Sequence, residues 1–176
     1  MSELIAPSIR LHRSFLAARQ EWGADAHQDG VGLRPVDDVE TPDGFSAWVS
    51  RLNQQSDATM PVDVGHVRST RWWITEGETY LGAIELRHHL TPVMLEAIGH
   101  IGYSVRPSAR GRGLATWALA TILPEARTLG LDRVLLTCDD NNTASARTIE
   151  KNDGVLEDVR ATTLGRKRRY WIQTTS

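Results

Sequence analysis

Cysteine is almost absent from this sequence, since Cys138 is the only one among its 176 residues. A single thiol forms no intrachain disulfide and excludes a four-cysteine zinc site, so we expect Cys138 to be a small apolar core residue. Long hydrophobic runs are missing too, because none approaches the ~20 residues that span a bilayer. Residues 1–7 also lack the basic start and long apolar core of a signal peptide. We therefore expect a cytoplasmic protein without a membrane partner.

The chain has little excess charge of either sign. Its 20 Lys and Arg residues stand against 22 Asp and Glu residues, which gives a formal net charge of −2 at pH 7. General nucleic-acid and anionic-membrane binders usually carry a clear positive charge. The basic run at residues 166–169 is an exception, and we expect it to lie on a solvated strand edge rather than to bind RNA. We predict no nucleic-acid partner.

The composition suits one folded domain, which we place at residues 1–176. Hydrophobic residues make up 40% of the chain and charged residues 24%, which allows a sizeable core. Apolar spacing predicts helices at residues 8–22, 41–52, 111–129 and 142–152, the third kinked or shortened by Pro124. Apolar runs predict strands at residues 70–74, 80–88, 98–105, 134–138, 154–163 and 168–174, with one more at the start of the chain. The order predicts an α/β fold of layered α+β type, a mixed central sheet of about seven strands flanked by about four helices.

One turn carries the clearest chemical signal. A predicted strand ends in Arg110-Gly111-Arg112-Gly113, which opens directly into a predicted helix. The first turn of a helix leaves four backbone N–H groups unpaired and carries the positive end of the helix dipole, so it is suited to bind a phosphate. The glycines let the backbone approach a ligand, and the arginines add charge and donors. The spacing fits neither a mononucleotide P-loop nor a dinucleotide loop.

These residues carry a resemblance to a known family. Arg110-x-x-Gly113-x-Ala115 resembles the [QR]-x-x-G-x-[GA] signature of the GNAT superfamily of N-acetyltransferases, and Asn142 with Ser145 resembles the Asn-x-x-[AS] that follows the next strand. The predicted order of elements agrees with the GNAT fold over nearly the whole chain, as in a bacterial subgroup of predicted acetyltransferases. The resemblance implies direct transfer of an acetyl group from acetyl-CoA to a primary amine in a ternary complex, without a metal.

The resemblance also implies a cofactor site. In GNAT enzymes the backbone amides of the signature turn hold the pyrophosphate of acetyl-CoA, here those of Arg110, Gly111, Arg112, Gly113, Leu114 and Ala115. The amide of Val105, at the end of the preceding strand, would bond the acetyl carbonyl and stabilise the oxyanion. Asn142 and Ser145 would contact the pantetheine arm or the diphosphate. Capping of the helix that begins there is the alternative role for this pair.

The catalytic acid and base are less clear from the motifs. Many GNAT members carry the acid as a tyrosine seven residues after the asparagine, and that position is Ile149 here. Tyr103 and Tyr170 are the candidates to replace it. His100 lies where many members have a glutamate that acts as the catalytic base, and a histidine is suited to proton transfer near neutrality. Glu85 on the preceding strand is the second candidate base, although either residue could instead be structural.

Two functions remain open at this point. The first is an N-acetyltransferase whose acceptor is a small metabolite, an amino-sugar or antibiotic, or a protein N-terminus or lysine. Residues 23–40, a polar stretch with three glycines, would close over that acceptor. The second is a catalytically weak sensor or interaction module that binds CoA or acyl-CoA, which Ile149 supports. GNAT proteins often form homodimers, but no residue pattern here fixes an interface.

Overall fold

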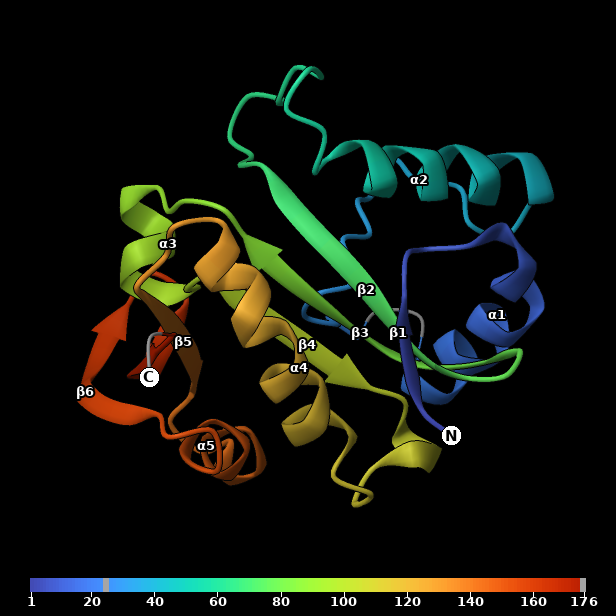
Figure 1. Ribbon diagram of the computed structural model, residues 1–176. Helices are drawn as coiled ribbons and strands as arrows, with labels where there is room; N and C mark the ends of the chain where they lie inside the picture. Colours follow the sequence, from blue (N-terminus) through green and yellow to red (C-terminus); the bar gives the residue numbers. More distant parts are fainter. Residues whose placement is uncertain (24–25, 175–176) are drawn as a thin grey trace.

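The structure, a computed structural model, describes residues 1–23 and 26–174 (Figure 1). Within these residues the chain forms seven strands, five α-helices and two short 3-10 helices. In chain order they are β1 (Glu3–Ile5), η1 (Ile9–Leu11), α1 (His12–Trp22), α2 (Pro42–Gln54), β2 (Ser69–Glu76), β3 (Thr79–Arg87), α3 (Pro92–Ala97), β4 (Ile101–Val105), η2 (Pro107–Ala109), α4 (Leu114–Thr128), β5 (Arg133–Asp139), α5 (Thr143–Glu150), β6 (Val155–Thr162) and β7 (Gly165–Gln173).

The strands are divided between two antiparallel sheets. One has the order β1-β2-β3-β4 and the other the order β5-β7-β6. They meet just before β4, where Gly99 and Leu136 form an isolated bridge and the His100 N–H donates to the Leu135 carbonyl at 2.7 Å. Beyond this junction β4 and β5 belong to different sheets, so the predicted central sheet is interrupted between them.

The first sheet separates two hydrophobic cores. Ile84 belongs to the core beneath α4 and α5, whereas its neighbour Ala83 belongs to the core beneath α1 and α2, as expected for successive strand residues that point to opposite faces. Figure 1 shows α4 crossing in front of the sheet, with α1 and α2 to its right. The second core is largely aromatic, with Phe15 at 4.9 to 6.0 Å from the rings of Phe45, Trp48, Trp73 and Tyr80.

The predicted α/β class and strand number are confirmed, and one helix was missed. Thr91 caps α3 by accepting the Met94 N–H, and Pro92 stands at its first position. Sequence analysis had assigned these residues to a connection, because six residues are too few to show a helical period. The helix with Pro124 starts at Leu114, three residues after its predicted start, and continues past the proline to Thr128.

The described residues contain neither a membrane-spanning helix nor a metal-binding cluster. Within residues 1–23 and 26–174, no helix is both long enough and apolar enough to cross a membrane. In the same residues no group of three His, Cys, Asp or Glu side chains is arranged to hold a metal ion.

The junction between the sheets gives a stability prediction. Gly99 has a φ of +79°, and a Cβ added there would lie 2.5 Å from the Leu135 carbonyl oxygen. Gly130, after α4, has the same φ of +79° but nothing within 4 Å of an added Cβ. We expect Gly130→Ala to cost about 1 kcal/mol through backbone conformation alone. We expect Gly99→Ala to cost about 3 kcal/mol, because the Leu135 backbone must also move.

Urea denaturation of both variants measures this difference. Equal losses in the two variants would show that the close approach of β5 to Gly99 contributes nothing to the free energy of unfolding. A larger loss in Gly99→Ala places the tight contact at the junction, since the conformational cost is common to both positions.

Candidate active site

The ladder between β3 and β4 determines which main-chain groups face β5. The Arg87 N–H donates to the His100 carbonyl at 2.7 Å, and the Arg106 N–H donates to the Leu81 carbonyl at 2.7 Å. Residues bonded to the neighbouring strand alternate along an antiparallel pair. The N–H and C=O groups of Tyr103 and Val105 therefore face away from β3, and we call this row of main-chain groups the β4 edge.

The glycine-arginine turn lies at the amino end of α4. Gly111 and Gly113 have φ values of +77° and +75°, and an added Cβ at either would meet no described atom within 4 Å. Gly113 is the N-cap residue, so the first N–H groups of α4 have no side-chain cap there. A hollow beside them is lined by Met1, Ser2, Arg112, Gly113, Leu114 and Trp117. Open amides at a helix start are suited to bind an anion.

The turn is tied to the β4 edge by Arg110. Its Nε donates to the Val105 carbonyl at 3.2 Å, and its guanidinium lies 4.6 Å from the centroid of the Trp22 ring. Arg112 instead forms an exposed ion pair with Glu76 at 2.5 Å, which contributes little to stability. The turn and the β4 edge thus form one continuous stretch of polar main chain.

The first turn of α5 lies beside this edge. Asn142 caps the helix, since its Oδ1 accepts the Ser145 N–H at 3.1 Å, and this is the capping role that the sequence left open. The Ser145 Oγ is 2.8 Å from the Tyr103 hydroxyl. Burial raises the pKa of Tyr103, which keeps its phenol protonated. The structure therefore brings Tyr103, Asn142 and Ser145 together, and their contacts with a cofactor stay a prediction.

Cys138 lies on β5 next to the same group. Its side chain is buried, as the sequence predicted. Burial raises the pKa of the thiol, and the charge of Arg168 opposes this effect more weakly. The thiol is therefore protonated near neutrality, which does not favour a nucleophilic role.

His100 is a structural part of the sheet junction. Its Nδ1 accepts the Leu135 N–H at 2.9 Å, and the residue is 7% exposed. Burial, and then the charge of Arg87, lower its pKa to about 4. In the neutral ring the proton is on Nε2, because Nδ1 already accepts a hydrogen bond. This geometry favours a structural role over the role of base that the sequence suggested.

Glu85 is also fully engaged. One of its carboxylate oxygens pairs with Arg71, and the other pairs with the Arg87 Nη2 at 2.7 Å. Burial lowers the pKa of Arg71, which is nevertheless held charged beside this carboxylate. An amine would have to displace an arginine before it reached either oxygen of Glu85.

The segment between α1 and α2 lies across β3 and β4 on the face of Glu85. A Cβ added to Gly30 would be 2.5 Å from the Gly102 carbonyl oxygen and 3.3 Å from the Ala83 carbonyl oxygen. This part of the predicted acceptor cover, residues 23–40, therefore touches the sheet directly. Residues 24 and 25 of that segment lie outside the described residues. His27 and Asp29 bond to each other in the same loop at 2.9 Å, and sequence analysis had not singled them out.

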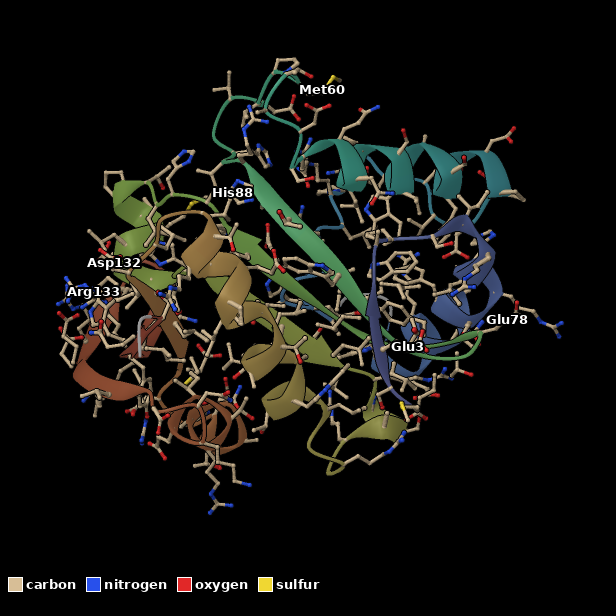
Figure 2. The ribbon with its side chains drawn as sticks, viewed as in Figure 1. Glu3, Met60, Glu78, His88, Asp132 and Arg133 are labelled. Atoms are coloured by element: carbon tan, nitrogen blue, oxygen red, sulfur yellow. The ribbon has the colours of Figure 1, made fainter. Side chains whose placement is uncertain are left out.

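Two further groups of basic residues lie away from the turn. His88 follows β3 and bonds to the Thr70 Oγ1 at 2.9 Å. Figure 2 shows His88 below the loop that carries Met60, at the end of β3 that pairs with the start of β4. The basic run lies on β7, the central strand of the second sheet, and Arg169 is buried, so the expected solvated strand edge is wrong. The run is neutralised by ion pairs of Arg166 and Arg168 with Asp140, Lys167 with Asp139, and Arg169 with Glu157 and Asp158.

Together the divided sheet, the β4 edge and the open turn at the start of α4 form a surface suited to an extended ligand with an anionic group at one end. The family model described as an acetyltransferase (GNAT) domain matches residues 14–155. The chain therefore belongs to the GNAT acetyltransferases. Membership confirms the predicted family, the N-acetyltransferase class and acetyl-CoA as the cosubstrate of that class.

Solved structures with the same fold are similar over almost the whole chain. An acetyltransferase from Salmonella typhimurium that modifies the N-terminal serine of a 50S ribosomal subunit protein has 16% identity and a TM-score of 0.68, with 98% of this chain and 94% of that chain covered. A ribosomal-protein-alanine acetyltransferase from Vibrio fischeri has 16% identity and a TM-score of 0.69, with 99% and 93% covered. The microcin C7 self-immunity acetyltransferase, in complex with acetyl-CoA and AMP, has 15% identity and a TM-score of 0.67, with 98% and 92% covered. No curated protein sequence matches this chain.

The buried His100 predicts a pH dependence of stability. Its pKa falls from 6.5 to about 4 on folding, so between these values the unfolded chain binds a proton that the folded chain does not. The free energy of unfolding should therefore fall as the pH falls through this window, by roughly 3 kcal/mol in total.

His100→Asn isolates this contribution. The asparagine Oδ1 can accept the Leu135 N–H in place of Nδ1, and it does not titrate. Chemical denaturation at pH 7 and at pH 4.5 should show a smaller loss in the variant than in the wild type, whatever its stability at pH 7. Equal losses would show that His100 does not control the acid sensitivity.

Proposed function

We propose that this chain transfers an acetyl group from acetyl-CoA directly to a primary amine of a small molecule or peptide in a ternary complex. The observation that carries the proposal is the continuity between the open turn at Gly111 and Gly113 and the β4 edge, which Arg110 links through the Val105 carbonyl. One end of this surface suits a diphosphate and the rest suits an extended amide-containing arm.

The turn holds the pyrophosphate in this proposal. The amides of Arg110, Gly111, Arg112, Gly113, Leu114 and Ala115 donate to its oxygens, and the positive end of the α4 dipole adds to the attraction. Arg110 already donates to the Val105 carbonyl, and Arg112 is paired with Glu76. Both arginines therefore add their charge to the turn while they keep these contacts. The microcin acetyltransferase structure, which contains acetyl-CoA, supports this role.

The pantetheine arm then follows the β4 edge toward the sheet junction. Val105 stands at the entrance beside Arg110, and its amide meets the arm first. The Gly99–Leu136 bridge closes the far end, so the acetyl group at the tip of the arm lies deeper, nearer the Tyr103 amide. We therefore assign the donor to the acetyl carbonyl to Tyr103 rather than to Val105. The Tyr103 N–H stabilises the oxyanion that forms on attack by the amine.

The departing thiolate needs a proton, and the Tyr103 hydroxyl supplies it. The hydrogen bond to the Ser145 Oγ places this hydroxyl between β4 and the first turn of α5. The usual position of the acid, Ile149, is fully buried in the hydrophobic core. Tyr103 reaches the region from a neighbouring strand instead, which supports an active enzyme over a catalytically weak CoA sensor.

The acceptor is a primary amine, and its particular identity follows from neither the turn nor the β4 edge. Two of the similar structures are acetyltransferases for ribosomal-protein serine or alanine residues, which supports a peptide N-terminus as one acceptor. The loop against Gly102 and Ala83 covers the acceptor side. Thiol release with a panel of peptides and small amines identifies the acceptor.

Gly113→Glu tests the cofactor site. A carboxylate at this position would face the pyrophosphate, so we expect acetyl-CoA binding to be lost in a folded protein. Gly130→Glu is the matched control, because Gly130 has a φ of +79° against +75° for Gly113 and both positions are open. Titration calorimetry with acetyl-CoA measures the result, and circular dichroism confirms folding.

Unchanged affinity in folded Gly113→Glu would overturn the assignment of the turn. Lost affinity in both variants would point to backbone strain at either end of α4 rather than to repulsion of the ligand. Wild-type protein that binds acetyl-CoA but releases thiol with no amine would support the sensor.

Tyr103→Phe tests the acid. We expect kcat to fall by about 100-fold, within the usual range for a general acid, while the affinity for acetyl-CoA changes little. Tyr170→Phe examines the other candidate, whose hydroxyl donates to the Glu150 carboxylate at 3.1 Å. Steady-state kinetics of the two variants decides between them, and a loss confined to Tyr170→Phe would exclude Tyr103.

A further inference from the structure

An exposed histidine and an aspartate form a pair in the loop between α1 and α2. The His27 Nε2 lies 2.9 Å from the Asp29 Oδ1, with the two side chains 86% and 66% exposed. Exposed ion pairs of this kind contribute little to stability. Both side chains are therefore held only loosely by folding and stay accessible to a ligand.

Asp29, one member of the pair, lies against Gly102 on β4. A Cβ added to Gly102 would be 3.4 Å from the Gly30 nitrogen, 3.6 Å from the Asp29 Cβ and 3.7 Å from the Arg87 Nη1. Gly102 is thus the point where the loop meets the strand. The peptide bond that follows Gly102 carries the N–H of Tyr103, the proposed donor to the acetyl carbonyl. Asp29 thus contacts the residue that immediately precedes Tyr103 on β4.

A second observation agrees with this closeness. Burial raises the pKa of Tyr103, and the Asp29 carboxylate adds to this effect as the weakest of several contributions. Gly30 has a φ of +79°, and a Cβ added there would lie 2.5 Å from the Gly102 carbonyl oxygen, so the close packing of the loop on β4 leaves no room for a side chain at this position.

The other basic groups on this side are engaged. Both oxygens of Glu85 face arginines, and the His100 Nδ1 accepts the Leu135 N–H. His27 differs, because its Nε2 bonds to Asp29 while its Nδ1 has no hydrogen-bond partner among the described residues. A carboxylate on one ring nitrogen fixes the tautomer and stabilises the charge that forms when the other nitrogen takes a proton.

We propose that His27 is the catalytic base for the acceptor amine and that Asp29 is its positioning residue. This inference rests on the proposed acetyl transfer. The His27 Nδ1 takes a proton from the ammonium group of the acceptor, and the neutral nitrogen attacks the acetyl carbonyl carbon. A C–N bond forms and the C–S bond breaks.

The remaining protons balance through Tyr103. The CoA sulfur leaves as a thiolate and takes the proton of the Tyr103 hydroxyl. The new amide nitrogen gives up its surplus proton to the tyrosinate, which restores the acid. His27 releases its proton to water, as its exposure allows, so each cycle releases one proton.

The experiment compares His27→Ala and Asp29→Asn with His66→Ala. His66 is an exposed loop histidine whose Nδ1 lies 3.2 Å from the Val64 carbonyl oxygen, so it controls for loss of a surface imidazole. Calorimetry measures acetyl-CoA affinity, and thiol release measures kcat and KM with serine-start and alanine-start peptides, spermidine and glucosamine. Added imidazole tests for rescue of His27→Ala.

We expect His27→Ala to lower kcat by about 100-fold or more, with acetyl-CoA affinity unchanged and partial recovery in imidazole. Asp29→Asn should lower kcat by about 10-fold, because it leaves the base but disturbs its tautomer. His66→Ala should match the wild type. Rescue by imidazole distinguishes a base from a residue that only holds the loop, since free imidazole replaces a proton acceptor but restores no packing.

The failures of the two proposals are distinguishable. Wild-type kcat in His27→Ala, or a loss that imidazole does not restore, overturns the base and leaves acetyl transfer intact. A wild-type protein that binds acetyl-CoA but acetylates no amine overturns the transfer reaction and the base together. A wild-type protein that does not bind acetyl-CoA overturns the cofactor site itself.

Discussion

The contact between His100 and Leu135 is the constraint on which the site depends. The His100 backbone N–H and ring Nδ1 both bond to Leu135, and together with the neighbouring Gly99–Leu136 bridge they join the two sheets. Because the join lies at the start of β4, the rest of that strand keeps its outward main-chain groups directed at β5. A continuous ladder there would have used these groups, and the β4 edge would offer nothing to an extended ligand.

The two faces of the first sheet, each covered by its own core, support different parts of the site. The face beneath α4 and α5 supports the turn at Gly113 and the group formed by Tyr103 and Ser145. The opposite face carries the aromatic core, the ion pairs of Glu85 and the loop that reaches Gly102. In the proposed function the acetyl donor belongs to the first face and the acceptor to the second, and β4 is where they meet.

The parts that the sequence predicted are local in the chain. Arg110 to Ala115 form a continuous signature, and Asn142 with Ser145 a spaced pair, so both were found without knowledge of the fold. The missed parts depend on contacts between distant residues. His100 was a candidate base with a structural role as the alternative, and the contact that favours the structural role is with Leu135 on another strand. Likewise, only the contact of their loop with Gly102 indicates a role for His27 and Asp29. The helix α3 was missed because six residues are too few to show a helical period.

The pairing of β1 with β2 has a consequence for the way the chain folds. Glu3 is opposite Thr75, so the first strand has no partner until both α1 and α2 have passed and β2 is formed. Pairing β1 with β2 closes a long loop, which costs conformational entropy. The contacts that offset this cost form only after β2 is in place. We therefore expect the amino end of the chain to become ordered late, after the β2–β3 hairpin, whose turn is short and whose β2 strand is the one that β1 pairs with.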